Sequence, residues 1–150
     1  MPELPSYVYV ASSWKNPYQP AVCAVLKAAG IDHYDFRNPP NGAAFSWEQI
    51  ADLPILDGLA DRDTYRRMLD HPVAEAGFAA DYAAMDKADT FVLVLPCGKS
   101  AHLELGWAVG QGKRTAILLE DPIQPELMYR MVDHLSPSVH ELLGWLGVED

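Results

Sequence analysis

Short apolar runs alternate along the chain with segments of helical periodicity. Four runs rich in β-branched, aromatic or other apolar residues predict strands, at 6–11, 31–36, 91–95 and 115–119. The third run is unbroken, and the fourth has only a threonine at its start, which is typical of strands that are buried on both faces of a sheet. Residues 131–135 form a weaker candidate for a fifth strand.

Helices are expected in the segments that separate these strands. The predicted helices cover 18–29, 62–70, 72–88, 101–111 and 136–146, and shorter helical turns are predicted within 46–53 and 125–130. Strands that alternate with helices form a parallel sheet through right-handed crossovers. The sequence therefore predicts an α/β protein, with a doubly wound, five-stranded parallel sheet of order 2-1-3-4-5, in one domain that spans residues 1–150.

This topology brings two loops together where the strand order reverses, between the first and third strands. The loops are 12–17 and 96–100, and ligands of open α/β sheets bind at this position. Glu104 falls in the first turn of the helix that follows the second loop, where the helix dipole favours an ionised carboxylate. Trp14 and Glu104 are therefore expected to face one cleft.

Composition and charge narrow the class of partner. The chain has 150 residues, is 49% hydrophobic and carries a net charge of −10, which repels a nucleic-acid polymer but not a small nucleoside or nucleotide. Its apolar runs are far too short to cross a membrane, and its first residues do not resemble a signal peptide. Cys23 and Cys97 have no metal-ligand spacing. We expect a cytoplasmic protein with reduced thiols, no metal and no cofactor.

Carboxylates in such a cleft suit the cleavage of a glycosidic bond, because one acid attacks or stabilises the anomeric carbon while another assists the leaving group. Glu104 is the first candidate, and Asp81, Asp86 and Asp89 are its possible partners. The alternative for Glu104 is a surface residue that only compensates the helix dipole. For Asp86 and Asp89 the favoured interpretation is a solvated position at a helix end.

Aromatic and polar residues near the loops add candidate contacts. The hydroxyl of Tyr9 could hold Glu104, or its ring could simply pack in the core. Trp14, Phe45 and Trp47 could stack on a flat base. For Phe45 and Trp47, sealing the edge of the core is the favoured alternative.

The polar segment after the third strand also has two interpretations. His102 could be a second acid or an exposed capping residue. Gly98, Lys99 and Ser100 do not form a phosphate-binding loop, because such a loop begins with a glycine where this chain has Leu93. The amides and Ser100 at the start of a helix could nevertheless hold an anion.

Three segments resemble the nucleoside 2-deoxyribosyltransferase family and its relatives, the 2′-deoxynucleoside 5′-phosphate N-hydrolases. The segment 8–14 resembles the first strand of the family with its active-site tyrosine, and 103–113 is similar to its catalytic segment. Asp81 stands eight residues before Asp89, as the second acid of the family stands before its central strand. The resemblance implies a flavodoxin-like fold and a homodimer or higher homo-oligomer, whose active sites are completed by a neighbouring subunit.

The resemblance also implies roles for individual residues. Glu104 would attack C1′ of the sugar, Tyr9 would orient Glu104, and Asp81 would bind near the base or sugar and assist proton transfer. Gly98 replaces an aspartate of the transferases. The other residues expected to contact the substrate are Ser12, Ser13, Trp14, Gly98, Lys99, Ser100, His102, Phe45 and Trp47.

Several alternatives remain open at this point. Lys99 beside Ser100 favours a 5′-phosphate, so a nucleotide N-glycosidase is an alternative to a transferase. A nucleotide-binding module without catalysis and an interaction protein without a ligand are further alternatives. Asp133 and His134 are the candidates for a residue donated by a neighbouring subunit.

Overall fold

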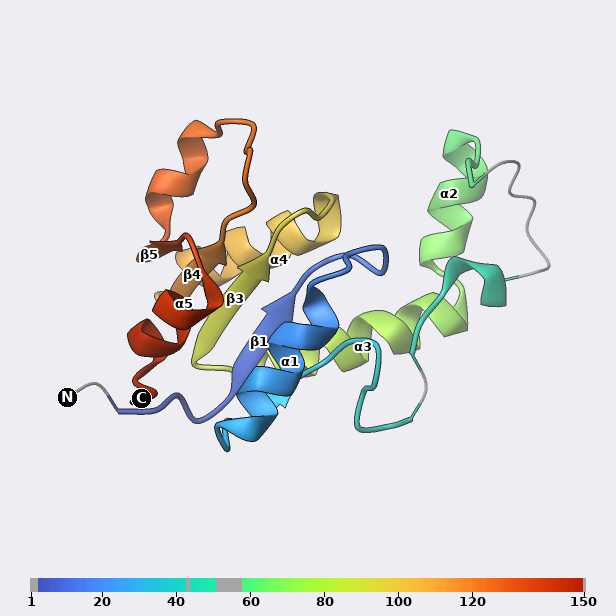
Figure 1. The fold of residues 1–150 in the computed structure, drawn as a ribbon. Coiled ribbons are helices and arrows are strands. Elements are labelled where there is room, and N and C mark those ends of the chain that lie inside the picture. The colour runs from blue at the N-terminus through green and yellow to red at the C-terminus, as the bar shows by residue number, and fades with distance from the viewer. Residues whose placement is uncertain (1–2, 43, 51–57, 150) are drawn as a thin grey trace.

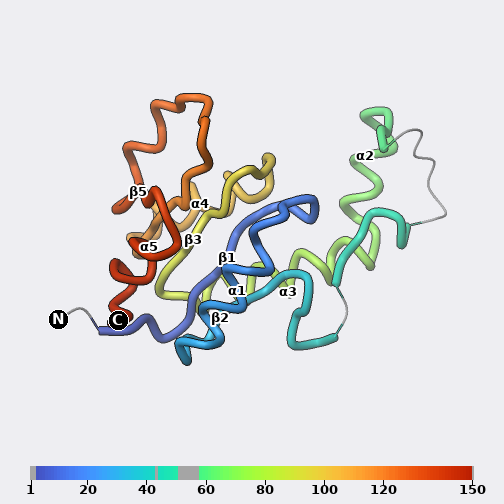
Figure 2. The backbone as a smooth tube through the Cα atoms, viewed as in Figure 1, coloured from blue at the N-terminus to red at the C-terminus, as the bar shows by residue number. Residues whose placement is uncertain are grey.

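A five-stranded parallel sheet forms the centre of the computed structural model, which describes residues 3–42, 44–50 and 58–149. The sheet order is β2-β1-β3-β4-β5, as predicted (Figures 1 and 2). The strands are β1 Val8–Ala11, β2 His33–Tyr34, β3 Thr90–Val94, β4 Arg114–Leu118 and β5 His134–Ser136. β1 and β3 are adjacent, so the predicted reversal of strand order lies between them.

Helices cover both faces of the sheet. The α-helices are α1 Gln19–Ala28, α2 Arg62–Leu69, α3 Pro72–Lys87, α4 Lys99–Gly110 and α5 Val139–Leu146. Because side chains alternate along a strand, Tyr9 and Phe91 point to the face covered by α3 and α4, whereas Val10 and Val92 point to the face covered by α1 and α5. Both faces are therefore apolar, which explains the unbroken hydrophobic runs of the central strands.

The edge strands differ from the predicted ranges. β2 has two residues, although 31–36 was expected, and β5 begins at His134, because a 3₁₀ helix, η2 Leu127–Met131, occupies the preceding segment. A second 3₁₀ helix, η1 Trp47–Gln49, follows Ser46, whose side chain accepts a hydrogen bond from the backbone of Glu48. The rest of the predicted helical turn, at 51–53, lies outside the described residues.

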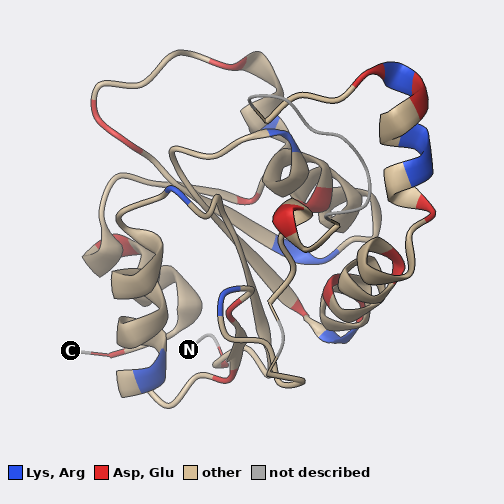
Figure 3. Ribbon diagram, turned by 90° about the vertical axis from the view of Figure 1, so that its right-hand side faces the viewer, with Lys and Arg blue, Asp and Glu red and all other residues tan. Residues whose placement is uncertain are grey.

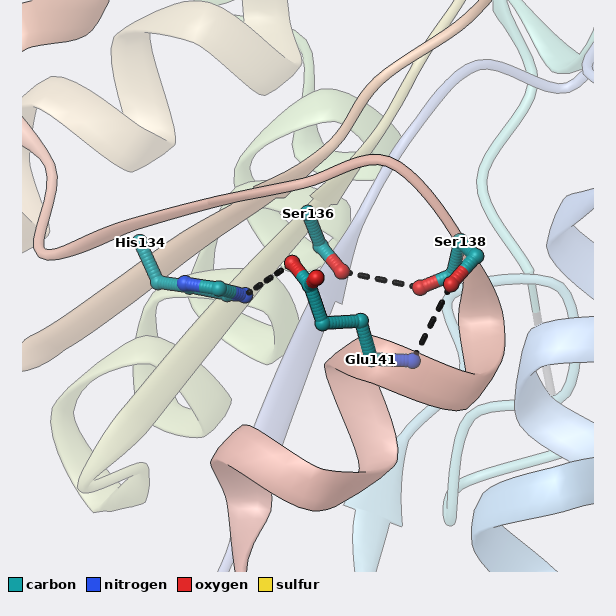
Figure 4. Close-up of polar contacts among 4 residues, drawn as sticks. All are labelled: His134, Ser136, Ser138 and Glu141. Carbon is teal, nitrogen blue, oxygen red and sulfur yellow. Dashed lines mark hydrogen bonds and ion pairs between the residues drawn. The ribbon is translucent and has the colours of Figure 1, made fainter.

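The last helix begins at Val139 rather than at Ser136, because Ser138 caps it. The side chain of Ser138 accepts a hydrogen bond from the backbone of Glu141, and the hydroxyl of Ser136 donates to the carbonyl of Ser138 over 2.8 Å. His134 lies 3.6 Å from a carboxylate oxygen of Glu141 (Figure 4). These contacts join β5 to α5 within the chain.

α2 lies at the amino end of α3 and stands away from the sheet (Figure 1). Its surface carries closely spaced charges of both signs (Figure 3), and the side chain of Asp61 caps its start by accepting from the backbone of Thr64. None of the helices in the described ranges is both long and apolar enough to cross a membrane.

Candidate active site

Two pairs of a phenol and a carboxylate lie side by side on the face covered by α3 and α4. The hydroxyl of Tyr9 donates a hydrogen bond to Oε2 of Glu104, and the hydroxyl of Tyr34 donates to Oδ1 of Asp81 over 2.7 Å. The two tyrosine rings are stacked, with their centroids 5.3 Å apart and their planes 18° apart. The stacked rings therefore bring together two acids that come from different helices.

The strand register explains why the two rings meet. Tyr9 of β1 is the direct partner of Tyr34 in β2 and of Phe91 in β3. The Phe91 ring stacks on Tyr9 with a centroid distance of 4.9 Å, so three rings form a row across three strands. Glu104 on α4 and Asp81 on α3 reach this row from the helix layer.

Burial controls the charge of both acids. Loss of solvent raises the pKa of Glu104 from 4.5 to about 7, against the hydrogen bond from Tyr9, which lowers it; the charge of Asp81 raises it further. Burial also raises the pKa of Asp81, and the hydrogen bond from Tyr34 opposes this shift. Glu104 can therefore be a carboxylate or an acid near neutral pH, which suits a group that takes part in bond cleavage.

Tyr9 stays protonated, so it can only donate to Glu104. Its side chain is 2% exposed, and burial together with the nearby charges of Glu104 and Asp81 raises its pKa far above the ordinary value. Because the Tyr9 proton engages Oε2, Oε1 is the glutamate oxygen that remains available to a substrate.

Hydrogen bonds join the two loops at the strand reversal, as the topology predicts. The hydroxyl of Ser12 donates to the carbonyl of Val94 over 2.8 Å. The amide of Asn16 donates to the carbonyls of Val94 and Pro96, over 2.9 and 2.8 Å. Asn16 is 2% exposed, and sequence reasoning missed it, because an asparagine before a proline reads as an ordinary turn residue.

Arg37 is a second residue that the sequence did not single out. Its guanidinium donates to the carbonyls of Ser13 and Asn16, over 3.1 and 3.0 Å, and lies 5.5 Å from the centre of the Trp14 ring. Trp14 is 52% exposed and meets Phe36 edge-on. Arg37 thus fixes the loop that carries the exposed indole, although no direct contact joins Trp14 to Glu104 or Asp81.

His102 turns away from the two acids. Its Nδ1 lies 2.7 Å from the carbonyl of Gly98, and its Nε2 lies 2.8 Å from the hydroxyl of Tyr129 in η2. A carbonyl can only accept, so Nδ1 carries a proton. His102, Cys97 and Tyr129 line a cavity of about 570 Å³ between α4 and the segment after β4, and Glu104 is not among its lining residues.

The remaining residues that were expected to contact a substrate lie in two places, at the start of α4 and beside α3. Gly98 is the N-cap of α4, and Lys99 and Ser100 are exposed in its first turn. The Phe45 ring packs on the backbone of Gly77, one turn before Asp81 in α3, and meets Trp47 edge-on at 4.9 Å. Phe45 thus has a packing contact close to the site.

The other acids considered as partners of Glu104 do not lie beside it. Asp86 is exposed near the end of α3, and Asp89 precedes β3, at the end of the strand opposite to the site. Asp89 accepts hydrogen bonds from the backbone and hydroxyl of Ser6, both at 2.9 Å. Although partial burial acts to raise the pKa of Asp89, these bonds hold it below the ordinary value.

Asp133 and His134 are engaged within the chain. Asp133 accepts from the backbone of Thr115 over 2.9 Å, and His134 stacks on Trp145 with the ring planes 9° apart. In the part of the chain that the structure describes, no group of three His, Cys, Asp or Glu side chains could hold a metal ion.

The sheet order and the course of the chain define a protein with the fold of a 2-deoxyribosyltransferase and a CMP N-glycosidase. The chain is similar to a 2-deoxyribosyltransferase from Bacillus psychrosaccharolyticus, with a TM-score of 0.58 and 15% identity over 95% of this chain and 97% of that chain. It is also similar to the CMP N-glycosidase BcmB from Clostridium botulinum, with a TM-score of 0.50 and 17% identity over 93% and 97% of the two chains.

A conserved protein from Enterococcus faecalis V583 has the same fold, with a TM-score of 0.60 and 15% identity over 94% of this chain and 96% of that chain. No protein-family model matches the sequence, and the comparison with curated proteins finds no match. At these identities the likeness defines the fold, and the argument for function rests on the side chains of the site.

Proposed function

We propose that the protein cleaves or transfers the N-glycosidic bond of a (deoxy)nucleoside or nucleotide through a covalent glycosyl intermediate on Glu104. The observation that carries the proposal is the Tyr9–Glu104 hydrogen bond, with Asp81 beside it on the same row of rings. The fold supports it, since similar structures include a 2-deoxyribosyltransferase and a CMP N-glycosidase.

In the proposed two-step reaction each group has a distinct role. In the first step Oε1 of ionised Glu104 forms a bond to C1′, the bond from C1′ to the base breaks, and its electron pair goes to the base nitrogen. Asp81, when protonated, gives a proton to the departing base. In the second step water or another base attacks C1′, the bond from C1′ to Oε1 of Glu104 breaks, and the proton of the attacking group passes to ionised Asp81, as in retaining glycosidases.

A nucleotide N-glycosidase is the second candidate within this chemistry. The N-cap of α4 is Gly98, so no side chain caps the helix, and the exposed Lys99 and Ser100 follow in its first turn. An uncapped helix start with a nearby cation favours a phosphate group. This observation supports a 5′-monophosphate as the substrate.

We also propose that the chain forms a homodimer or a higher homo-oligomer. Phe78 and Tyr82 on α3 are 68% and 42% exposed, and Leu103 on α4 is 75% exposed. Apolar side chains of this size on neighbouring helices favour a protein partner. A mass measurement in solution tests the proposal, and a monomer at all concentrations would contradict it.

The test of activity incubates the protein with deoxynucleosides, ribonucleosides and their 5′-monophosphates, with and without an acceptor base. Release of free base identifies a hydrolase, and a new nucleoside identifies a transferase. The Glu104→Ala variant should lose both products, and a glycosyl adduct should appear on the intact wild-type protein by mass spectrometry. Base release that persists unchanged in Glu104→Ala would refute the role of Glu104.

Asp86→Asn is the matched control for Asp81→Asn, because both aspartates belong to α3 and Asp86 is exposed. Asp81→Asn should slow base release, whereas Asp86→Asn should leave it unchanged. Saturable nucleotide binding without turnover at high protein concentration would instead favour a binding module.

A further inference from the structure

Tyr34 is a buried phenol whose hydroxyl reaches the second acid of the site. It ends β2, is 3% exposed, and donates to Oδ1 of Asp81 over 2.7 Å. Its ring is fixed on the other side by the stack with Tyr9. Among the described residues, Tyr34 is the one that donates a hydrogen bond to the side chain of Asp81.

We infer that Tyr34 is a positioning residue that holds Oδ1 of Asp81 and leaves Oδ2 to face the leaving base. The inference deepens the proposed function and rests on it. The geometry leads to this inference, because the ring of Tyr34 is fixed and Oδ1 accepts its hydrogen bond. The carboxylate of Asp81 cannot rotate without breaking that bond.

The chemistry of the phenol determines where Asp81 carries its proton. Burial, the hydrogen bond to Asp81 and the charge of Asp81 all raise the pKa of Tyr34, so its hydroxyl keeps its proton at neutral pH. Since Tyr34 always donates to Oδ1, a proton on Asp81 resides on Oδ2. Tyr34 therefore directs the acidic proton away from the core and towards the substrate.

The two pairs are parallel in construction but separate in function. In each pair a phenol on the sheet donates a hydrogen bond to an acid on a helix. Burial raises the pKa of the acid, and the hydrogen bond from the phenol lowers it. Tyr9 serves the group that attacks C1′, and Tyr34 serves the group that assists the base. The stacked rings hold the two acids at a constant spacing.

A double-mutant cycle tests the inference in the full-length protein. Tyr34→Phe keeps the ring and the stack but removes the donor, and it should lower kcat/KM by about tenfold, since a hydrogen bond to a charged group is worth roughly that factor. In the Asp81→Asn background the same substitution should have little further effect. An equal loss in both backgrounds, or no loss in either, overturns the inference.

Tyr7→Phe is the matched control. Tyr7 is a buried tyrosine of the same core cluster, it precedes β1, and in the described part of the chain its hydroxyl bonds no carboxylate. The control should keep the wild-type rate. A loss in Tyr7→Phe equal to that in Tyr34→Phe would show that any missing hydroxyl disturbs this core, and it would overturn the positioning role.

A titration that needs no activity separates this inference from the proposed function. The carboxyl carbon of Asp81 is followed by NMR against pH in the wild type and in Tyr34→Phe. The pKa of Asp81 should rise in the variant, because the ionised form loses its donor. An unchanged pKa overturns the inference, whereas absent base release by the wild type overturns only the proposed function.

Discussion

The hydroxyl of Tyr9 donates a hydrogen bond to Oε2 of Glu104, from a residue 95 positions earlier in the chain. This bond joins β1, the first strand in the chain, to α4, the helix that follows the central strand β3. It counteracts the effect of burial on the pKa of Glu104, and it engages one of the two carboxylate oxygens, Oε2. The first two predictions concern this pair.

In the Asp81→Asn background, where the second acid no longer titrates, the rate of base release should rise with pH through about 7. Burial raises the pKa of Glu104 to about 7, so the carboxylate that attacks C1′ is protonated and inactive at lower pH. We expect kcat/KM to fall about tenfold for each pH unit below this value. In Tyr9→Phe this rise in rate should move to higher pH, because the hydrogen bond that lowers the pKa of Glu104 is lost. A rise near 4.5, or one that Tyr9→Phe does not move, contradicts the assignment.

Glu104→Gln should stabilise the fold at pH 8. The pKa of Glu104 is raised from 4.5 to about 7 on folding, so its contribution to stability is fully present below about 4.5 and is lost as the pH rises through about 7. Glutamine mimics the protonated acid at every pH. The gain in the free energy of unfolding has an upper limit of roughly 3 kcal/mol at pH 8 and should nearly vanish at pH 4.5.

Urea unfolding of the wild type and of Glu104→Gln at both pH values measures this difference. Asp86→Asn serves as the control, since the exposed Asp86 should show the same small change at both pH values. A Glu104→Gln protein that is less stable than the wild type at pH 8 would show that the ionised glutamate stabilises the fold.

Gly77→Ala should destabilise the protein, although replacing a glycine within a helix by alanine usually stabilises a protein by about 1 kcal/mol. A Cβ at position 77 would lie 2.9 Å from three atoms of Phe45, so the ring must move from α3. Gly110→Ala in α4 is the matched control, because a Cβ there meets nothing within 4 Å, and it should be neutral or stabilising. Thermal unfolding of both variants checks the prediction, and a higher Tm for Gly77→Ala would contradict it.

Asn16→Ala should lower both stability and activity. The amide of Asn16 joins the loop after β1 to the carbonyls of Val94 and Pro96, and its Oδ1 accepts from the backbone at the start of α1. Losing these buried bonds should cost about 2 kcal/mol. Asn38→Ala is the control, because Asn38 is exposed and its side chain donates to Asp35 at the surface, so it should cost less than about 0.5 kcal/mol. Unfolding curves and base release measure both effects.

The pattern of the sequence predicts the sheet order and the helix that carries Glu104 correctly, but α4 begins at Lys99, so Glu104 lies in its second turn rather than in the first. Both follow from local signals: unbroken apolar runs mark the central strands, helical segments separate them, and the handedness of the crossovers restricts their order. The position of Glu104 early in α4 follows directly, because α4 begins just after β3 ends.

The edge elements were predicted less accurately for the same reason. β2 pairs with one neighbour only and retains two residues, and η2 replaces the start of the predicted fifth strand. An edge strand is paired on one side only, so its length depends on contacts with a single neighbour, which hydrophobic periodicity does not record.

The sequence by itself determined the layers of this protein and the acid at the mouth of its sheet, because periodicity and strand length are local properties of the chain. Only the tertiary structure decided that Tyr34 serves Asp81, that Asn16 and Arg37 hold the loops, and that His102 faces Tyr129. These contacts depend on the strand register and on which side of a helix each residue occupies, and both are set when distant segments pack together.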